Sequence, residues 1–336
     1  MPGIFQSHRI LIGTTWMMTE NFGESKVCSP GVLAASTLSS FDSTTERPRL
    51  PSLVFDSLGH KSVADHKAAM RLTDRDRAII ELVARARALR DDQIQMALFS
   101  ANSTSRCQRR LTLLVRNRYL DRLPGRSVSE PAVYVLTRRS TAGNRFVRAQ
   151  WGEIAFRNHM TKIGSLPHLL GINDVRVRVE RACFDLGWTL LRWRRSEDLQ
   201  QRLQGQRLIP DAYFTIQQQP NSPLASFFLE LERSAKSLQV LRSKLLRYAT
   251  LYHRQETQPR ERSMQVLFVF DEPHSVGAFR RIEPAKREAE RLGLPFVRFL
   301  ELQPLRKVTA EAVLTEPLWI APGRNTSIAL LNGKGS

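Results

Sequence analysis

Two apolar runs separated by turn residues most constrain how this chain can fold. They cover residues 211–216 and 226–232, and the polar stretch between them contains Pro220 and Asn221. Proline and asparagine favour turns, and short apolar runs on either side of a turn are typical of a β-hairpin. We therefore predict a hairpin whose turn is centred between Pro220 and Asn221.

The register of this hairpin places three acidic residues on one face. Asp211 would lie opposite Glu230, and Glu232 shares that face because side chains alternate along a strand. Like charges that face each other destabilise a sheet, so the cluster favours a hard divalent cation, Mg²⁺ or Mn²⁺, with Asp211 and Glu230 as metal ligands. Alternatively, nearby basic residues such as Arg233 and Arg242 neutralise carboxylates that serve only solubility. Both interpretations stay open at this point.

The elements expected around the hairpin indicate an α/β domain. Periodicity and apolar runs predict a helix, three strands, a helix, a strand, a helix and a final strand, and this order is typical of a mixed sheet flanked by helices. Outside the hairpin, the helices are expected at 169–185, 238–253 and 280–292, and the strands at 188–193, 264–270 and 296–300.

Residues 71–150 predict a separate, basic domain. This segment holds seventeen arginines, no lysine and seven acidic residues, in a chain whose net charge is +19. Thr73 is a suitable N-cap for a first helix, a second helix is expected over 91–99, and a third follows the polar stretch 100–104. Two short strands after the third helix predict a wing. Three helices and a wing predict a winged helix-turn-helix, so the fold class is multi-domain α/β.

The third helix of such a fold enters the major groove of double-stranded DNA, and the wing reaches flanking phosphates. The alternatives are that arginine is merely a frequent surface residue of this chain, or that the winged fold binds protein. The candidate DNA-binding residues are Ser103, Ser105, Arg106, Arg109 and Arg110 on or near the third helix, and Arg126, Arg138 and Arg139 on or after the wing.

The element order and the acidic residues resemble the PD-(D/E)xK nuclease superfamily. Asp211 opens the second strand of the domain, and Glu230 and Glu232 close the third. The resemblance implies metal-dependent hydrolysis of a phosphodiester, in which the metal neutralises charge and activates water. It further implies that Asp211 and Glu230 hold the metal, with Glu232 as a ligand or base.

The chain departs from this pattern because Glu232 stands where the superfamily has lysine. In some members the lysine has moved to the next helix, which implies Lys236 or Lys244 as the electrostatic helper. The first helix of such domains often contributes a glutamate, and Glu180 is the candidate here.

Motifs along residues 71–253 resemble the replication-relaxation family of bacterial plasmids and other mobile elements. That resemblance implies a role in DNA replication, relaxation or mobilisation, with double-stranded DNA, replication or mobilisation proteins and a second copy of the chain as partners. His168 matches a recurring histidine of the family, with either a structural role or a role as proton carrier or ligand. The motifs are Arg71-Leu-Thr-Asp-Arg-Asp76, His168-Leu-Leu-Gly-Ile-Asn-Asp-Val175, Pro210-Asp211, Phe228-Leu-Glu-Leu-Glu-Arg233 and Lys244-Leu-Leu-Arg-Tyr248.

Two other functions remain open. One is a DNA-binding regulator or replication accessory whose nuclease-like domain has lost catalysis, as Glu232 at the lysine position suggests. The other is a tyrosine-dependent relaxase, because Tyr248 and Tyr252 stand one helical turn apart. No histidine pair of the His-apolar-His type, which such relaxases use for metal, accompanies the tyrosines, and this disfavours the second function.

Composition divides the chain into five segments. We expect a mostly disordered leader over 1–70, the winged helix-turn-helix over 71–137, a linker over 138–167, the nuclease-like domain over 168–303 and a tail over 304–336. The sequence shows no apolar stretch long enough to span a membrane. Its three cysteines are far apart, which favours a reducing cytoplasm over a disulfide framework or a zinc site.

Overall fold

A computed structural model describes most of the chain beyond the predicted leader. Contacts along the chain divide it into residues 1–66 and 67–336, and all of the described residues lie in the second unit. The predicted leader, apart from Met70, lies outside the described residues. These are 70–123, 130–136, 141–151, 166–200, 208–233, 237–255, 264–271 and 275–332.

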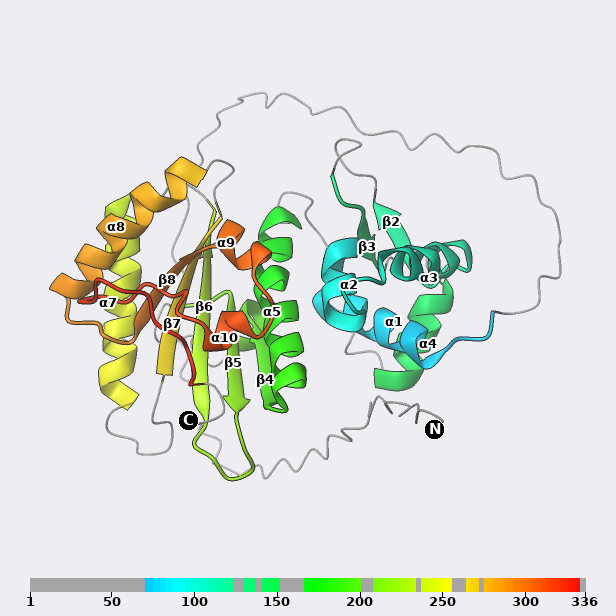
Figure 1. Ribbon diagram of the computed structural model, residues 1–336, viewed down its shortest axis with the longest axis horizontal. Helices are drawn as coiled ribbons and strands as arrows, with labels where there is room; N and C mark the ends of the chain where they lie inside the picture. The colour runs from blue at the N-terminus through cyan, green and yellow to red at the C-terminus, as the bar shows by residue number, and fades with distance from the viewer. Residues whose placement is uncertain are drawn as a thin grey trace, which may run out of the picture. The chain divides into compact units, whose positions relative to one another are not determined.

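The amino-terminal part, here called the helical module (described residues of 70–151), packs helices against a small sheet (Figure 1). Its sheet has the strand order β1-β3-β2 and is antiparallel throughout. Thr73 caps the first helix through a capping box with Asp76, as the sequence predicts. The elements are α1 (Asp74–Ala86), β1 (Ala88–Arg90), α2 (Asp91–Leu98), α3 (Thr104–Arg116), β2 (Asp121–Leu123), β3 (Val133–Val135) and α4 (Thr141–Trp151).

Two of these elements are additions to the prediction. β1 is a three-residue strand, too short to show a period of two, and pairing with β3 stabilises it. α4 lies inside the segment predicted to be a linker, and it forms there because its buried Val147 joins the core of α1 and α3. The domain boundaries themselves stay a prediction.

The carboxyl-terminal part, here called the sheet module (described residues of 166–332), contains a mixed five-stranded sheet of order β4-β5-β6-β7-β8. β4, β5 and β6 pair antiparallel, whereas β6, β7 and β8 pair parallel, so the predicted mixed α/β sheet is confirmed. The elements are α5 (Leu166–Leu186), β4 (Thr189–Arg195), α6 (Ser196–Gln200), β5 (Ala212–Gln217), β6 (Ala225–Glu232), α7 (Leu238–Gln255), β7 (Met264–Phe270), α8 (Ser275–Arg291), β8 (Val297–Glu301), α9 (Leu302–Lys307) and α10 (Ala312–Thr315).

The hairpin of β5 and β6 has the predicted register. Ala212 pairs with Leu229, and the Asp211 amide donates to the Leu229 carbonyl at 3.0 Å, so Asp211 stands opposite Glu230. Asn221 adopts a φ of 67° in the turn, a conformation that asparagine tolerates better than most residues. The turn residues and the alternation of side chains therefore sufficed to predict this pairing.

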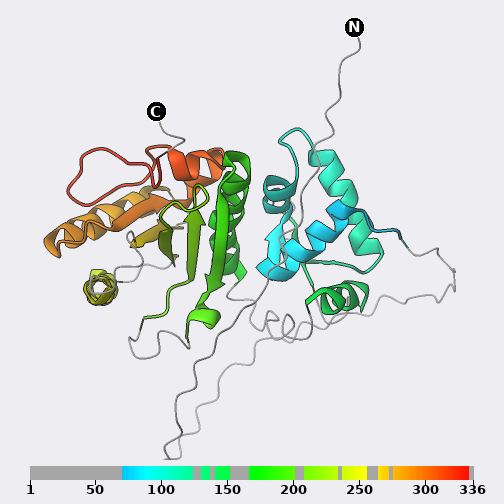
Figure 2. The ribbon, with the colours of Figure 1, turned by 90° about the horizontal axis from the view of Figure 1, so that it is seen from below.

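Helices cover the two faces of the five-stranded sheet (Figure 2). α5, α9 and α10 pack on one face, where Leu229 and Leu231 of β6 are buried, and α7 and α8 pack on the other, where Phe228 is buried. α5 lies very close to β6, because a Cβ added at Gly171 would stand 2.5 Å from Leu231 Cδ2. Alternation along β6 therefore directs Glu230 and Glu232 toward α7.

The end of the chain belongs to the same core. Trp319 is fully buried, and its indole N–H donates to the Val313 carbonyl at 2.9 Å. Isolated bridges join Phe299 to Ile320 and Trp319 to Ile328. The described part of the predicted tail is thus integral to the sheet module. Among the described residues, no helix combines the length and apolar character that a membrane crossing requires.

Candidate functional site

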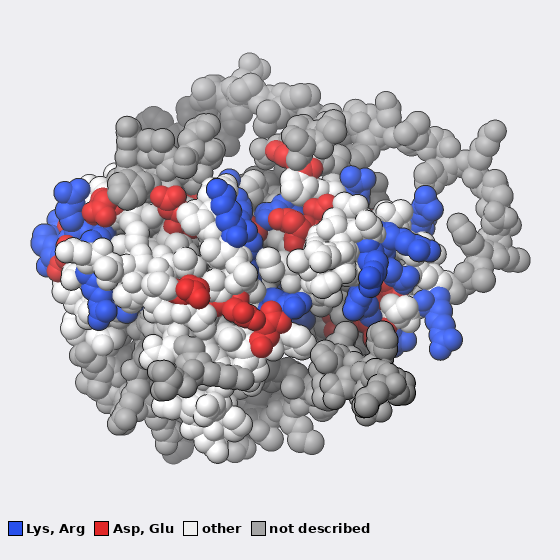
Figure 3. All heavy atoms as spheres, viewed as in Figure 1, with Lys and Arg blue, Asp and Glu red and all other residues white. Residues whose placement is uncertain are grey.

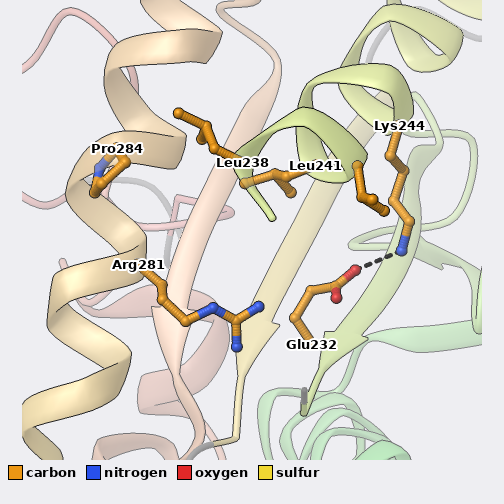
Figure 4. Close-up of a pocket in the computed structure, with 7 residues that line it drawn as sticks. Glu232, Leu238, Leu241, Lys244, Arg281 and Pro284 are labelled. Carbon is orange, nitrogen blue, oxygen red and sulfur yellow. Dashed lines mark hydrogen bonds and ion pairs between the residues drawn. The ribbon is translucent and has the colours of Figure 1, made fainter. Parts of the chain in front are cut away.

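β6 and α7 bring two glutamates, a lysine and a tyrosine into contact, a group called here the Lys244 cluster (Glu230, Glu232, Lys244 and Tyr248). Lys244 Nζ donates to Glu230 Oε2 at 2.9 Å and to Glu232 Oε1 at 2.5 Å, the second contact being drawn in Figure 4. The Tyr248 hydroxyl, one helical turn further on, donates to Glu230 Oε1 at 2.6 Å. Both glutamates are 2% exposed. The cluster is therefore part of the interior of the sheet module.

Burial and charge perturb the titration of this cluster. Burial raises the pKa of Glu230 to about 7, because it penalises the charged form more than the neighbouring Lys244 ammonium favours it. Burial alone would lower the pKa of Lys244, but Glu230 and Glu232 raise it above its ordinary value. Burial and the charge of Glu230 raise the pKa of Tyr248. At neutral pH the lysine is therefore charged, and Glu230 is close to the midpoint of its titration.

Asp211 stands beside the cluster but has partners of its own. Its Oδ2 accepts the Leu231 amide at 2.7 Å, and its Oδ1 lies 3.0 Å from His168 Nε2. His168 comes from the first turn of α5, on the face of the sheet opposite α7. The structure thus joins His168, the recurring histidine of the sequence motif, to Asp211 and not to Glu230 or Glu232.

The geometry of the described residues does not provide a metal site. Within the described part of the chain, no group of three or more His, Cys, Asp and Glu side chains is arranged to hold a metal ion. Lys244 Nζ lies between Glu230 and Glu232, in contact with an oxygen of each, where a shared cation would bind. The residues therefore do not fit Mg²⁺ or Mn²⁺ as they stand, and that cofactor stays a prediction.

The other predicted catalytic residues lie elsewhere. Glu180 accepts from Arg176 Nε at 2.9 Å on α5. It is twelve residues beyond His168 on the same helix, which at the rise of an α-helix is about 18 Å. The structure therefore does not bring Glu180 together with Asp211. Lys236 lies outside the described residues.

A small pocket opens beside the Lys244 cluster, between α7 and α8 (Figure 4). Its volume is about 120 Å³, and Arg281 of α8 extends into it toward Glu232. Leu238 and Val240, which line its α7 side, are 47% and 48% exposed. This volume is below that of typical ligand pockets, about 300–1,000 Å³, so the pocket does not suit a substrate of ordinary size.

α3 exposes a basic face, called here the α3 face (Ser105, Arg106, Gln108, Arg109, Thr112 and Arg116, all exposed). No acidic residue interrupts α3, and its opposite side carries Cys107, Leu111 and Leu114 into the core. Basic side chains gather over the part of the molecule that contains α1, α3 and α4 (Figure 3). Of the predicted DNA-binding residues, Ser105, Arg106 and Arg109 lie on this face.

Two predicted DNA-binding residues have internal partners instead. Ser103 is 7% exposed and shares a hydrogen bond with the Ser100 hydroxyl. Arg110 pairs with the fully buried Asp76, donating from Nε at 2.8 Å. Gln108, which was not among the predicted DNA-binding residues, also lies on the α3 face, because it stands three residues after Ser105. Arg126, Arg138 and Arg139 lie outside the described residues.

The tyrosine pair has structural contacts. Tyr248 is fully buried and is hydrogen-bonded to Glu230. Tyr252 stacks on Phe296 with ring centroids 4.2 Å apart. A nucleophilic tyrosine needs an accessible hydroxyl, so the burial of Tyr248 disfavours a relaxase that cuts with this residue.

Comparison with known protein families gave a match. The family model described as replication-relaxation matches residues 80–267, more than half of the chain, and this match spans α3, α5, β5, β6 and α7. No curated protein matches the chain. No solved structure matches it either.

Proposed function

The chain belongs to the replication-relaxation family, and we propose that it binds double-stranded DNA through α3 in the replication or relaxation of a plasmid or other mobile element. The observation that carries this proposal is the α3 face, whose arginines are exposed while the apolar side of the helix is buried. Arginine contacts to phosphates supply most of the salt-dependent affinity of DNA-binding proteins.

The arrangement of the helical module supports the same proposal. α1, α2 and α3 are followed by the antiparallel strands β2 and β3, which is the order of a winged helix-turn-helix. In that fold the α3 face enters the major groove, where Arg109 donates to guanine and Gln108 pairs with adenine. Arg106 and Arg116, near the two ends of the helix, then contact phosphates.

Replacing Arg106 and Arg109 by alanine tests this function. We expect the double variant to bind a short duplex about tenfold more weakly and to reduce the slope of log K against log salt by about 1–2, because phosphate contacts are lost. The measurement is fluorescence anisotropy at several salt concentrations. The control is Arg181→Ala with Arg291→Ala, which removes the same charge from exposed ion pairs of the sheet module. Equal binding by the two double variants would refute DNA binding through α3.

Metal-dependent DNA nicking is a second candidate function. It is favoured by the register that sets Asp211 opposite Glu230 and by Lys244, which reaches both Glu230 and Glu232. These are the residue types that the PD-(D/E)xK resemblance requires, on a sheet of the expected order. Against it, Lys244 neutralises the two glutamates and Asp211 has separate partners. The geometry supports DNA binding without cleavage better.

A cleavage assay separates the two functions. Supercoiled plasmid that carries the origin region is incubated with the protein and Mg²⁺, Mn²⁺ or EDTA, beside a variant with Asp211→Ala and Glu230→Ala. We expect the wild-type protein to shift the plasmid on a gel without nicking it under any of these conditions. Nicking that requires metal and is lost in the variant would establish a nuclease and overturn this expectation.

A further inference from the structure

The middle of α5 is buried on all sides because both modules pack against it. Its residues from Leu170 to Val179 are all buried, polar ones included. Val175 and Val179 join the core of the sheet module, whereas Val177 joins the core of the helical module. A helix that is buried all round is an internal element of a larger body. The two modules thus share α5.

A polar network, called here the Asp174 latch (Asp174, Arg90, Gln93 and Arg306), lies where the modules meet on α5. Asp174 is fully buried, and its Oδ1 accepts from Arg90 Nη2 at 2.6 Å and from Gln93 Nε2 at 2.8 Å. Its Oδ2 accepts from Arg306 Nε of α9 at 2.8 Å. Arg90 and Gln93 belong to the helical module. One carboxylate therefore joins the start of α2, the middle of α5 and α9.

Neighbouring contacts strengthen the same junction. Asn173 Nδ2 donates to the carbonyls of Ala86 and Ala88 at 3.1 and 2.8 Å, which joins α5 to the end of α1 and to β1. Gln93 Nε2 also donates to the Leu170 carbonyl at 2.7 Å. Each of these hydrogen bonds has one directional donor and one acceptor, so a shift of α2 along α5 would leave buried polar groups without partners.

The latch also connects to the carboxyl-terminal end of β6, where Glu232 of the Lys244 cluster lies. Arg306 Nη1 lies 3.9 Å from Asp271 Oδ1, and Asp271 Oδ2 accepts from Arg233 Nε at 2.8 Å. The Asp271 amide donates to the Glu232 carbonyl at 3.0 Å. A continuous series of polar contacts therefore runs from α2, which packs against α3, to the end of β6.

We propose that Asp174 is a positioning residue that fixes the helical module in one orientation on α5, so that the α3 face is held in a single arrangement for DNA. This inference rests on the proposed DNA binding by α3. A purely apolar junction would tolerate small rotations, whereas a buried carboxylate that several donors share is satisfied in one register only. The orientation of α3 is thus set before DNA arrives, which lowers the ordering cost of binding.

The test measures orientation without DNA. Spin labels are placed at two exposed positions, Thr112→Cys on α3 and Ser243→Cys on α7, in the full chain with Cys28→Ser, and distances are measured by double electron–electron resonance. We expect a single narrow distribution in the parent. Arg90→Gln removes the latch from the helical module and should broaden the distribution about twofold, because more than one orientation becomes populated. Asp174→Asn should broaden it at least as much.

A matched control shares the boundary but not the burial. Arg87 forms an ion pair between the modules at 2.7 Å with Glu197, whose side chain is 50% exposed, and Glu197→Gln should leave the distribution unchanged. If Asp174→Asn fails to fold, Arg90→Gln decides the question alone. A narrow, unshifted distribution in Arg90→Gln would overturn the proposal.

DNA affinity provides the second readout. With the α3 arginines intact, Arg90→Gln should raise Kd about tenfold, because only a fraction of the molecules holds α3 in the competent orientation. A broadened distribution with unchanged Kd would overturn the link between the latch and DNA. The distance measurement contains no DNA, so its result does not depend on the DNA-binding proposal. If the variant with Arg106 and Arg109 replaced refutes DNA binding through α3, the distances still show whether Asp174 fixes the orientation.

Discussion

Asp174→Asn is expected to lower the free energy of unfolding by about 3–5 kcal/mol, because removing one partner of a buried ion pair leaves the others uncompensated. Asp174 is fully buried, and Arg90 and Arg306 both donate to it. Arg178, also buried, has a guanidinium nitrogen 3.8 Å from Asp174 Oδ1. The side-chain amide of the introduced asparagine would present an NH₂ group, itself a donor, to guanidinium groups that are also donors. The measurement is chemical denaturation followed by circular dichroism at pH 7.

A control on the same helix isolates burial as the cause. Asp185 also pairs with an arginine, Arg181, at 2.7 Å, but the two side chains are 23% and 28% exposed. Asp185→Asn should therefore cost about 0–1 kcal/mol. Equal losses for Asp174→Asn and Asp185→Asn would contradict the assignment of Asp174 as a buried junction.

The pKa of Asp174 determines how its contribution to the free energy of unfolding depends on pH. Burial alone would raise that pKa, but Arg90 and Arg306 hold it below the ordinary value of 3.8. A depressed folded-state pKa gives stability that is fully present above the unfolded-state pKa and is lost as the pH falls through the folded-state value. The difference between the wild type and Asp174→Asn should hence be constant near neutrality and shrink only in acid below the ordinary aspartate pKa.

Local rules predicted much of this fold from the sequence. The hairpin register followed from the turn at Pro220 and Asn221 and from the period of two along β6. The start of α1 followed from Thr73, whose capping box with Asp76 is present. These features depend on residues that are close in sequence, so they need no knowledge of the tertiary structure. Short elements such as β1 were missed because partners far along the chain stabilise them.

The partners of the charged residues could not be predicted in the same way. Asp211 and Glu230 were placed opposite each other correctly, yet the Asp211 carboxylate is bound by His168 of α5, 43 residues earlier in the chain. Asp174 and Arg90 are 84 residues apart, and only the packing of α2 on α5 brings them together. The sequence predicted Arg110 as an exposed residue of α3, whereas in the structure it pairs with the buried Asp76 of α1. Long-range packing, which leaves no periodic pattern, decides these pairings.

Lys244→Met should destabilise the protein by about 3–5 kcal/mol at pH 8, because it leaves Glu230 and Glu232 facing each other without a cation. Both glutamates are 2% exposed, so water cannot replace the ammonium. Burial already raises the pKa of Glu230 to about 7 in the wild type, and loss of the Lys244 charge raises it further. A raised folded-state pKa gives stability that is present below the unfolded-state value of 4.5 and is lost as the pH rises through the folded-state value.

The cost of Lys244→Met should therefore grow between pH 5 and pH 8, because Glu230 loses the proton that keeps it neutral when the lysine is absent. The measurement is the denaturation midpoint of the wild type and of Lys244→Met at several pH values between 5 and 8. Lys286→Met is the control, since its i,i+4 partner Glu290 lies 3.8 Å away and is 35% exposed, and it should cost at most about 1 kcal/mol at every pH. Adding Glu232→Gln to Lys244→Met should recover part of the loss at pH 8. A pH-independent loss, or no recovery, would mean that Lys244 stabilises the interior by packing and not by neutralising the two glutamates.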